Sequence, residues 1–187
     1  MKTSRKEFPT LPQFVGKSVY LKPAGPDDIF NARVWINKYD PQIFWASPMP
    51  AVTPAEASDQ FKKAERSVHE QVYAIVRCDD DMLVGTIGYH NLNMQNRSAE
   101  LRIVVDPDEQ RKGHGVESVR LLTRHLFKQR GLNKVYVEVS EANHVATTFF
   151  EKRFPFRRDA TLRQHYFMSG TFHDGYIFSL LALDLDW

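Results

Sequence analysis

The chain has 187 residues, of which 42% are hydrophobic and 26% charged, and its formal net charge is +2. This length suits one domain with a real core and excludes wholesale disorder, while the near-neutral charge argues against a nucleic-acid partner. The one cysteine, Cys78, excludes an internal disulfide. No apolar run approaches the roughly 20 residues that span a bilayer, and the basic N-terminus lacks the apolar stretch of a signal peptide. We therefore expect a cytoplasmic protein with no membrane partner.

The first half of the chain predicts a tail at residues 1–16 and then a domain, residues 17–187, that begins with a strand and two helices. Alternating apolar residues indicate the strand, and helical spacing of apolar residues indicates the first helix. Thr53 and Glu56 form a capping box with Pro54 between them, which marks the start of the second helix. Three strands follow. The predicted elements span residues 17–25, 26–38, 53–70, 71–76, 83–92 and 98–105.

The second half predicts a helix, a strand, a further helix and a closing hairpin. Val116, Val119, Leu122 and Leu126 line one face of the first of these helices, and Gly131 stands where its C-terminal cap belongs. These elements span residues 114–131, 133–140 and 142–154, with the hairpin turning at residues 169–170. The order β-α-α-β-β-β-α-β-α-β-β predicts a single α/β (α+β) domain with a mixed, mostly antiparallel sheet and at least one parallel crossover.

The segment "DPDEQRKGHGVESVRLL", residues 106–122, joins a strand to a helix through two glycines. Backbone N–H groups at the start of a helix have no intrahelical acceptor and attract anions. Gly113 and Gly115 let the backbone approach a phosphate, and Arg111 and Lys112 add positive charge. The spacing matches neither a P-loop nor a dinucleotide-binding loop. From the residues alone, an ordinary strand-to-helix turn is the alternative.

The motif "QRKGHG" matches Q/R-x-x-G-x-G/A, and in its context the chain resembles the GCN5-related N-acetyltransferases (the GNAT family), most closely their RimJ/RimL type. Segments that carry the resemblance cover roughly residues 17–183 in order. They read "VYLKPAGPDD", "FWASPMPAVTPAEA", "AELRIVVDPDEQRKGHGVESVRLLTRHLF", "GLNKVYVEVSEANHVA" and "LRQHYFMSGTFHDGYIFSLL". The resemblance implies the GNAT fold, acetyl-CoA as cosubstrate and transfer of its acetyl group to an amine.

The same resemblance implies where acetyl-CoA binds. The loop amides from Arg111 to Val116 would hold its pyrophosphate, and its pantetheine arm would lie along the preceding strand. We expect the His114 side chain to face solvent. Asn143 matches the family residue that contacts the arm, although Asn is also a good helix N-cap. The implied contacts are Ile103, Val104, Val105, Gln110, Arg111, Lys112, Gly113, His114, Gly115, Val116 and Asn143.

Glu100 is the candidate general base, because many relatives carry a glutamate on this strand. The alternative is a surface carboxylate paired with Arg102. The resemblance assigns the oxyanion contact to a strand amide, here that of Val104 or Val105.

The general acid is where the chain departs from the family. Phe150 stands where many members have tyrosine, and Ala146 where RimJ/RimL-type members often have serine. The expected Leu-Gly-Phe also reads Phe154-Pro155-Phe156. Thr147 is the candidate substitute acid. A non-catalytic acyl-CoA-binding domain is therefore an alternative function.

The aromatic residues Trp35, Phe44 and Trp45 fall in the part that lines the acceptor side in this fold, and packing between helices is their alternative role. On subfamily resemblance the acceptor is first a protein or peptide N-terminus, and second a small amine such as a polyamine, amino sugar or antibiotic. We expect a monomer or homodimer. The histidines are scattered, so no metal site is expected, and the acidic turn after Cys78 argues against a nucleophilic cysteine.

Overall fold

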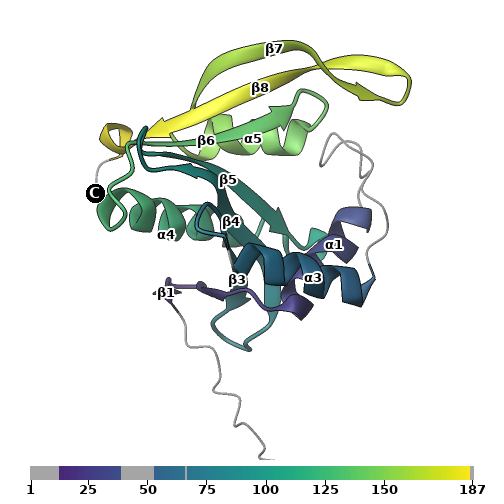
Figure 1. The fold of residues 1–187 in the computed structure, drawn as a ribbon, viewed down its shortest axis with the longest axis vertical. Helices are drawn as coiled ribbons and strands as arrows, with labels where there is room; N and C mark the ends of the chain where they lie inside the picture. Colours follow the sequence, from purple (N-terminus) through teal and green to yellow (C-terminus); the bar gives the residue numbers. More distant parts are fainter. Residues whose placement is uncertain (1–12, 39–52, 66, 186–187) are drawn as a thin grey trace, which may run out of the picture.

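The computed structural model, which describes residues 13–38, 53–65 and 67–185, contains one eight-stranded sheet in the order β1-β2-β3-β4-β5-β6-β8-β7 (Figure 1). The strands are β1 (Phe14–Val15), β2 (Val19–Pro23), β3 (Gln71–Arg77), β4 (Leu83–Asn93), β5 (Ser98–Val105), β6 (Lys134–Ser140), β7 (Arg157–Met168) and β8 (Thr171–Leu181). The helices are α1 (Pro26–Lys38), α3 (Pro54–Glu65), α4 (His114–Lys128) and α5 (His144–Arg153), with short 3₁₀ turns η1 (Pro107–Glu109) and η2 (Ala182–Asp184).

The predicted fold class and the predicted order of elements from residue 17 onward are confirmed. Several boundaries differ by a few residues, and two of the differences change what packs against the sheet. The sheet already takes in Phe14 and Val15, inside the segment expected to be a tail, because Phe14 packs its ring against Tyr73 and His125. The second predicted helix ends at Glu65 rather than at residue 70, because His69 instead pairs with the backbone of Leu92 beside β4.

The core lies on both faces of the sheet. On one face, α1 contributes Ala32, Trp35 and Ile36, which cluster with Val104 of β5. On the other face, the predicted stripe of α4 is confirmed, because its apolar side chains belong to the larger cluster that also includes Phe150 of α5. α4 ends at Lys128, before the predicted end at residue 131, and its C-cap is Gln129. Gly131 follows at a φ of +68°, a left-handed conformation that suits glycine where the chain leaves the helix. No helix in the described part of the chain is long and apolar enough to cross a membrane.

The predicted parallel crossover joins β5 to β6, and this pairing is short. In the described chain it joins Ser98–Glu100 to residues 134–136, although β5 continues to Val105. Figure 1 shows the two strands diverging beyond that point. β4 pairs with β5 along its length, so β5 beyond Glu100 has a strand neighbour on one side only.

Backbone groups along β5 point alternately toward β4 and toward the side where β6 no longer pairs. The register therefore decides which residues present free backbone groups on that side. Asp106 donates its N–H to Val84 directly opposite, so the register places Val104 in the same hydrogen-bonded set facing β4. Ile103 and Val105 then turn their backbone groups away from β4. The Val105 carbonyl agrees with this, because it accepts a hydrogen bond from the Gln110 side chain at 3.4 Å.

Candidate active site

The loop between β5 and α4 ends in a left-handed turn that exposes the start of the helix. Arg111 and Gly113 have φ values of +62° and +93°, and Gly113 is the N-cap residue of α4. No side-chain cap of this turn is present in the described chain. The first amides of α4, from His114 to Val116, have no intrahelical acceptor by helix geometry. An uncapped helix start with flanking positive charge fits an anionic group.

Gly115 lies where the loop meets the diverging strands. A Cβ built on it would lie 3.5 Å from Val105, 3.6 Å from Phe149 and 3.7 Å from Ile103. These are ordinary contact distances, so a methyl group would fit and a longer side chain would have to enter the space between β5 and α5. Gly115 thus keeps the backbone of α4 close to the outward-facing edge of β5.

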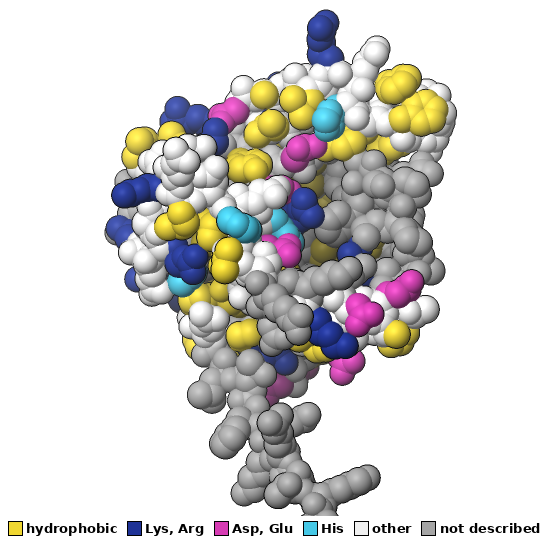
Figure 2. Space-filling view, viewed as in Figure 1, with side chains coloured by type: hydrophobic (Ala, Val, Ile, Leu, Met, Phe, Trp, Pro, Cys, Tyr) yellow, Lys and Arg dark blue, Asp and Glu magenta, His cyan; other side chains and the backbone are white. Residues whose placement is uncertain are grey.

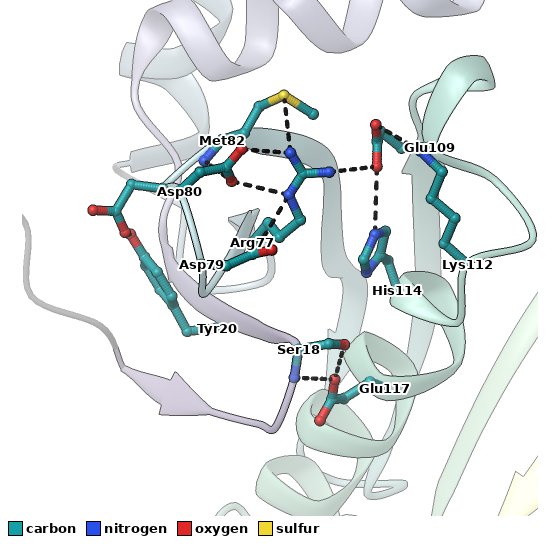
Figure 3. Close-up of polar contacts among 11 residues, drawn as sticks. Ser18, Tyr20, Arg77, Asp79, Asp80, Met82, Glu109, Lys112, His114 and Glu117 are labelled. Carbon is teal, nitrogen blue, oxygen red and sulfur yellow. Dashed lines mark hydrogen bonds and ion pairs between the residues drawn. The ribbon is translucent and has the colours of Figure 1, made fainter.

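An ionic network lies beside this loop (Figure 3). The buried carboxylate of Glu109 accepts hydrogen bonds from Lys112 Nζ at 2.9 Å and from Arg77 at 3.1 Å. The Lys112 contact lowers the pKa of Glu109, and the Arg77 charge acts in the same direction. Arg77 also binds Asp79 and Asp80 in the β3–β4 turn. The network therefore ties the glycine loop to β3.

His114 contradicts the expectation of a solvent-facing side chain. It is the first residue of α4 and only 7% of its side chain is exposed. Its Nε2 atom lies 3.4 Å from Glu109. The side chain points toward Glu109 rather than solvent because η1 and β3 bring Glu109 and Arg77 to the start of α4 (Figure 3).

Glu117, one turn along α4, anchors the helix to the first strands. Its carboxylate accepts hydrogen bonds from the backbone of Lys17 and from both the backbone and the hydroxyl of Ser18. Partial burial raises the pKa of Glu117, but these hydrogen bonds outweigh it and the pKa is lowered. The helix that follows the glycine loop is thus held in its first turn by a carboxylate that the loop motif does not include.

Glu100 lies on the α1 side of the sheet, and both of its oxygens have partners. Arg102 Nε donates to one at 2.7 Å and Asn91 Nδ2 donates to the other at 2.7 Å. Asn91 reaches this position because β4 has a register shift there and Asn91 itself has a φ of +50°. The pairing with Arg102 that the sequence offered as an alternative is present. A role of Glu100 in proton transfer stays a prediction.

A second carboxylate on the same face, Glu138 of β6, is surrounded by residues of β7. Tyr166 donates its hydroxyl to Glu138 at 2.5 Å and His165 Nε2 lies 3.1 Å from the same oxygen. Successive strand residues normally point to opposite faces. Here a register shift, with Gln164 at a φ of +51°, brings both side chains to Glu138 over Gly175. Burial and then the Glu138 contact raise the pKa of Tyr166.

Glu100 and Glu138 belong to one polar surface. Tyr136, which pairs with Glu100 across β5 and β6, stands between them on the same face, and Glu100 also raises the pKa of Tyr166. The β7–β8 hairpin, which carries His165 and Tyr166, projects at one end of the molecule (Figures 1 and 2). We call Glu100, Tyr136, Glu138, His165 and Tyr166 the carboxylate face. Sequence analysis identified only Glu100 among them.

The start of α5 has the capping geometry that the sequence left open for Asn143. The Asn143 side chain accepts a hydrogen bond from the backbone of Ala146 at 3.0 Å. The Thr147 hydroxyl donates to the Asn143 carbonyl at 3.0 Å, which is a common local role for threonine in helices. Thr147 also lines a hollow of about 650 Å³ with Arg158 and Tyr176. Contact of Asn143 with acetyl-CoA and acid catalysis by Thr147 both stay predictions.

Phe150, at the tyrosine position of the family, is a core residue. It is buried, and its ring lies 5.1 Å from the rings of both Phe149 and Phe156. Phe154 completes this aromatic cluster. The altered motif around Phe154 and Phe156 is thus accommodated by packing of phenyl rings, with no hydroxyl at position 150 to donate a proton.

The remaining candidates divide between core and surface. Trp35 is 8% exposed and packs with Val104, which leaves little of it to contact an acceptor. Phe44 and Trp45 lie outside the described residues. Partial desolvation and then the Glu117 charge raise the pKa of Cys78, which disfavours the thiolate. The described residues contain no group of three or more His, Cys, Asp or Glu that could hold a metal ion.

Comparison with known proteins decides the family. The profile described as "Acetyltransferase (GNAT) family" matches residues 39–156. The chain belongs to the GNAT family of acetyltransferases. Acetyl-CoA is the acyl donor of this family.

Relatives of this GNAT protein include enzymes with named substrates. Spermidine N(1)-acetyltransferase of Escherichia coli (strain K12) is 25% identical over 157 residues, which are 84% of this chain and 82% of the relative. "Uncharacterized N-acetyltransferase YoaA" of Bacillus subtilis (strain 168) is 28% identical over 109 residues. That match spans 58% of this chain and only 61% of the relative's length.

A solved structure shares the fold of this GNAT protein. The spermidine N-acetyltransferase of Vibrio cholerae, in complex with CoA and spermine, superimposes with a TM-score of 0.80 at 20% sequence identity. The match covers 89% of this chain and 97% of that one. At this identity the likeness shows the fold alone.

Proposed function

We propose that this protein transfers the acetyl group of acetyl-CoA to a primary amine of a small molecule that carries a second positive charge, such as a polyamine. The observation that carries the proposal is the pair of carboxylates, Glu100 and Glu138, on one face beside the point where β5 and β6 separate. The similarity to spermidine acetyltransferases supports it. A peptide N-terminus is also a primary amine, but it has no need of a second carboxylate.

The donor side of the proposed site consists mostly of backbone. The loop amides from His114 to Val116 bind the pyrophosphate, assisted by the positive charge of Arg111 and Lys112. The pantetheine arm follows β5 and pairs with Ile103 and Val105, whose backbone groups face away from β4. Gly115 supports this role because it presents no side chain to the space between β5 and Phe149.

In the reaction the amine nitrogen attacks the thioester carbonyl, a C–N bond forms and the C–S bond breaks. The negative charge that develops on the carbonyl oxygen requires a donor placed beforehand. The N–H of Val105 fits this task better than that of Val104, because the register turns Val104 toward β4. The departing thiolate takes up a proton, and the acetylated amine loses one.

Loss of the amine proton is the step in which Glu100 acts. An alkylamine with a pKa near 10.4 is only about one part in a thousand neutral near pH 7.4, so a base matters for such an acceptor. Both oxygens of Glu100 have donors, Arg102 and Asn91, which leave lone pairs for a water molecule. We propose that Glu100 accepts the proton through such a water molecule.

Glu138 supplies the second contact for the acceptor. It lies one strand over from Glu100 and two residues farther along, which separates the two backbone positions by about 8 Å. Its side chain is 35% exposed, so a ligand can reach it, and Tyr166 fixes its orientation. An acceptor that presents one amine at Glu100 can therefore place a second ammonium group at Glu138.

The test is the rate of CoA thiol release from acetyl-CoA with four acceptors: spermidine, putrescine, n-butylamine and a short peptide with a free N-terminus. We expect spermidine and putrescine to give the highest kcat/KM. Putrescine and n-butylamine have the same four-carbon chain and differ only in the second amine. A preference for the peptide would overturn the proposed acceptor, and release with no amine at all would overturn acetyl transfer to amines.

A further inference from the structure

His114 is a buried titratable group that the proposed reaction does not use. Neither of its ring nitrogens has a hydrogen-bond partner among the residues that the structure describes. One of them, Nε2, points at Glu109 from 3.4 Å, just beyond normal hydrogen-bonding distance. A buried polar group without a partner is unfavourable, and imidazole changes its charge between pH 5 and 8.

Glu109 is held by Arg77 and Lys112, and these two partners differ in mobility. Arg77 is fixed by the carboxylates of Asp79 and Asp80 in the β3–β4 turn. Lys112 is half exposed, with 50% of its side chain accessible, and it belongs to the glycine loop itself. A lysine ammonium on a flexible stem can move to a nearby phosphate, whereas the fixed guanidinium cannot.

Binding of a pyrophosphate at the loop changes the charge balance around His114. The ligand brings negative charge next to Lys112 and competes with Glu109 for its ammonium group. As Lys112 leaves, Glu109 loses a hydrogen-bonded positive partner in a site where little water can replace it. Both changes favour a positive charge on the imidazole, because an opposite charge nearby stabilises the charged form.

We propose that acetyl-CoA binding is coupled to proton uptake by His114, which then replaces Lys112 as the partner of Glu109. This inference rests on the proposed role of the glycine loop. The charged groups that face His114 are Glu109 from η1, Lys112 from the loop and Arg77 from β3. Glu117 on the same helix is turned toward Ser18. Arg77 opposes protonation of His114, and Glu109 and the ligand favour it.

The coupling has a defined direction with pH. A site that takes up a proton on binding holds its ligand more tightly as the pH falls, over the range between the pKa of the titrating group in the complex and its lower pKa in the free protein. Acetyl-CoA affinity therefore rises from pH 8 to pH 6. Glu109 is a positioning residue in this scheme, because it acts on the loop through Lys112 and His114 and does not touch the ligand.

The experiment is isothermal titration calorimetry of CoA binding to the full chain at pH 7, in buffers with different ionisation enthalpies. The slope of observed enthalpy against buffer ionisation enthalpy counts the protons taken up. Dephospho-CoA is a second probe, because it lacks the 3′-phosphate, a group whose own second pKa is about 6. We expect uptake between zero and one proton for both probes, and none in His114→Gln.

Two further variants complete the comparison. Lys112→Met removes the competing ammonium group, so Glu109 should already pair with protonated His114 in the free protein and the uptake should fall. His125→Gln changes a histidine in the last turn of α4 and should leave the uptake unchanged. An equal slope in the wild type and in folded His114→Gln overturns the inference. Absence of any CoA binding overturns the loop assignment as well.

A measurement on the wild type alone covers the case in which His114→Gln does not fold. NMR spectra of the imidazole nitrogens, recorded against pH with and without CoA, report the titration of His114 directly. We expect its midpoint to move to higher pH when CoA is bound. A midpoint that stays in place, or moves to lower pH, overturns the inference while leaving the role of the loop in CoA binding intact.

Discussion

The two sides of the proposed active site use different groups to bind their ligands: backbone groups on the donor side and side chains on the acceptor side. The donor side is one continuous segment, from β5 through the glycine loop into α4, and it offers mainly backbone groups. The carboxylate face is assembled from side chains of β5, β6 and β7, brought together by short pairings and a register shift. Ligand binding by backbone groups tolerates most side-chain substitutions and is lost when a new side chain blocks the ligand's path. Ligand binding by side chains can be weakened by a single substitution at any of them.

The largest expected effect is on the donor side, at Gly115. We expect Gly115→Asp to lose acetyl-CoA binding, because its carboxylate would enter the space beside Val105 and Phe149 and repel the pyrophosphate. A ligand at about 100 times its Kd stabilises the folded state by about 2.7 kcal/mol. This corresponds to a rise in Tm of about 5–10 °C for a chain of this size. Thermal denaturation with and without acetyl-CoA measures it.

The matched control at this position is Gly115→Ala. A methyl group meets its neighbours at ordinary contact distances, so this variant should keep most of the shift. A full shift in folded Gly115→Asp would show that the donor does not follow this path.

Next in size is the effect of Glu100→Gln on turnover. The amide keeps the shape of the carboxylate. Its oxygen can still accept from Arg102, and its NH2 group can donate to Asn91 once the Asn91 amide turns over, so the fold should be preserved. Removal of a general base lowers kcat by about 10²–10⁴, while acetyl-CoA affinity should stay as in the wild type. Steady-state rates with saturating amine across pH 6–9 measure the change. Wild-type kcat in this variant would restrict Glu100 to a structural role.

A smaller and more selective effect is expected for Glu138→Gln. Loss of a charged partner for the second ammonium group should raise KM for putrescine by about tenfold to a hundredfold, with little change for n-butylamine. The ratio of kcat/KM for the two amines is the measurement. Asp59→Asn, at an exposed carboxylate on α3 that pairs with Lys62, removes the same charge as a control. If the ratio stays the same in Glu138→Gln, this carboxylate does not bind the second ammonium group of the acceptor.

Tyr166→Phe refines the same comparison. The phenyl ring keeps the packing over Gly175 but removes the hydrogen bond that orients Glu138. We expect a change in the amine ratio of the same sign as in Glu138→Gln and smaller in size, because the carboxylate keeps its charge. An effect larger than that of Glu138→Gln would point to direct contact between Tyr166 and the acceptor.

The smallest effects on rate are expected at the positions of the missing acid. A thiol with a pKa near 8.5 is a fair leaving group, so Thr147→Val and Phe150→Tyr should each change kcat by less than about tenfold. Phe150→Tyr places a hydroxyl among phenyl rings and should lower the free energy of unfolding by about 1–3 kcal/mol. A loss of a hundredfold or more in folded Thr147→Val would identify Thr147 as the acid.

The order of the elements and the glycine turn could be predicted from the sequence because their signals are local. The capping box at Thr53, the glycines at 113 and 115 and the apolar stripe of α4 each reflect the conformation of a few neighbouring residues. The order of the elements follows from such signals. The glycine motif depends on backbone conformation, as the left-handed φ of Gly113 shows.

The tertiary structure decided which side chains from distant segments come into contact. No local pattern places Glu109 against Arg77 or turns His114 inward, because these contacts depend on how β3 lies beside the glycine loop. Glu138 meets His165 and Tyr166 only through the register shift in β7 and the pairing of β6 with β8. By itself the sequence determined the fold class and the position of the glycine turn, since backbone conformation is set by near neighbours. The arrangement of the carboxylate face and the burial of His114 were decided by the packing of strands that are far apart in the chain.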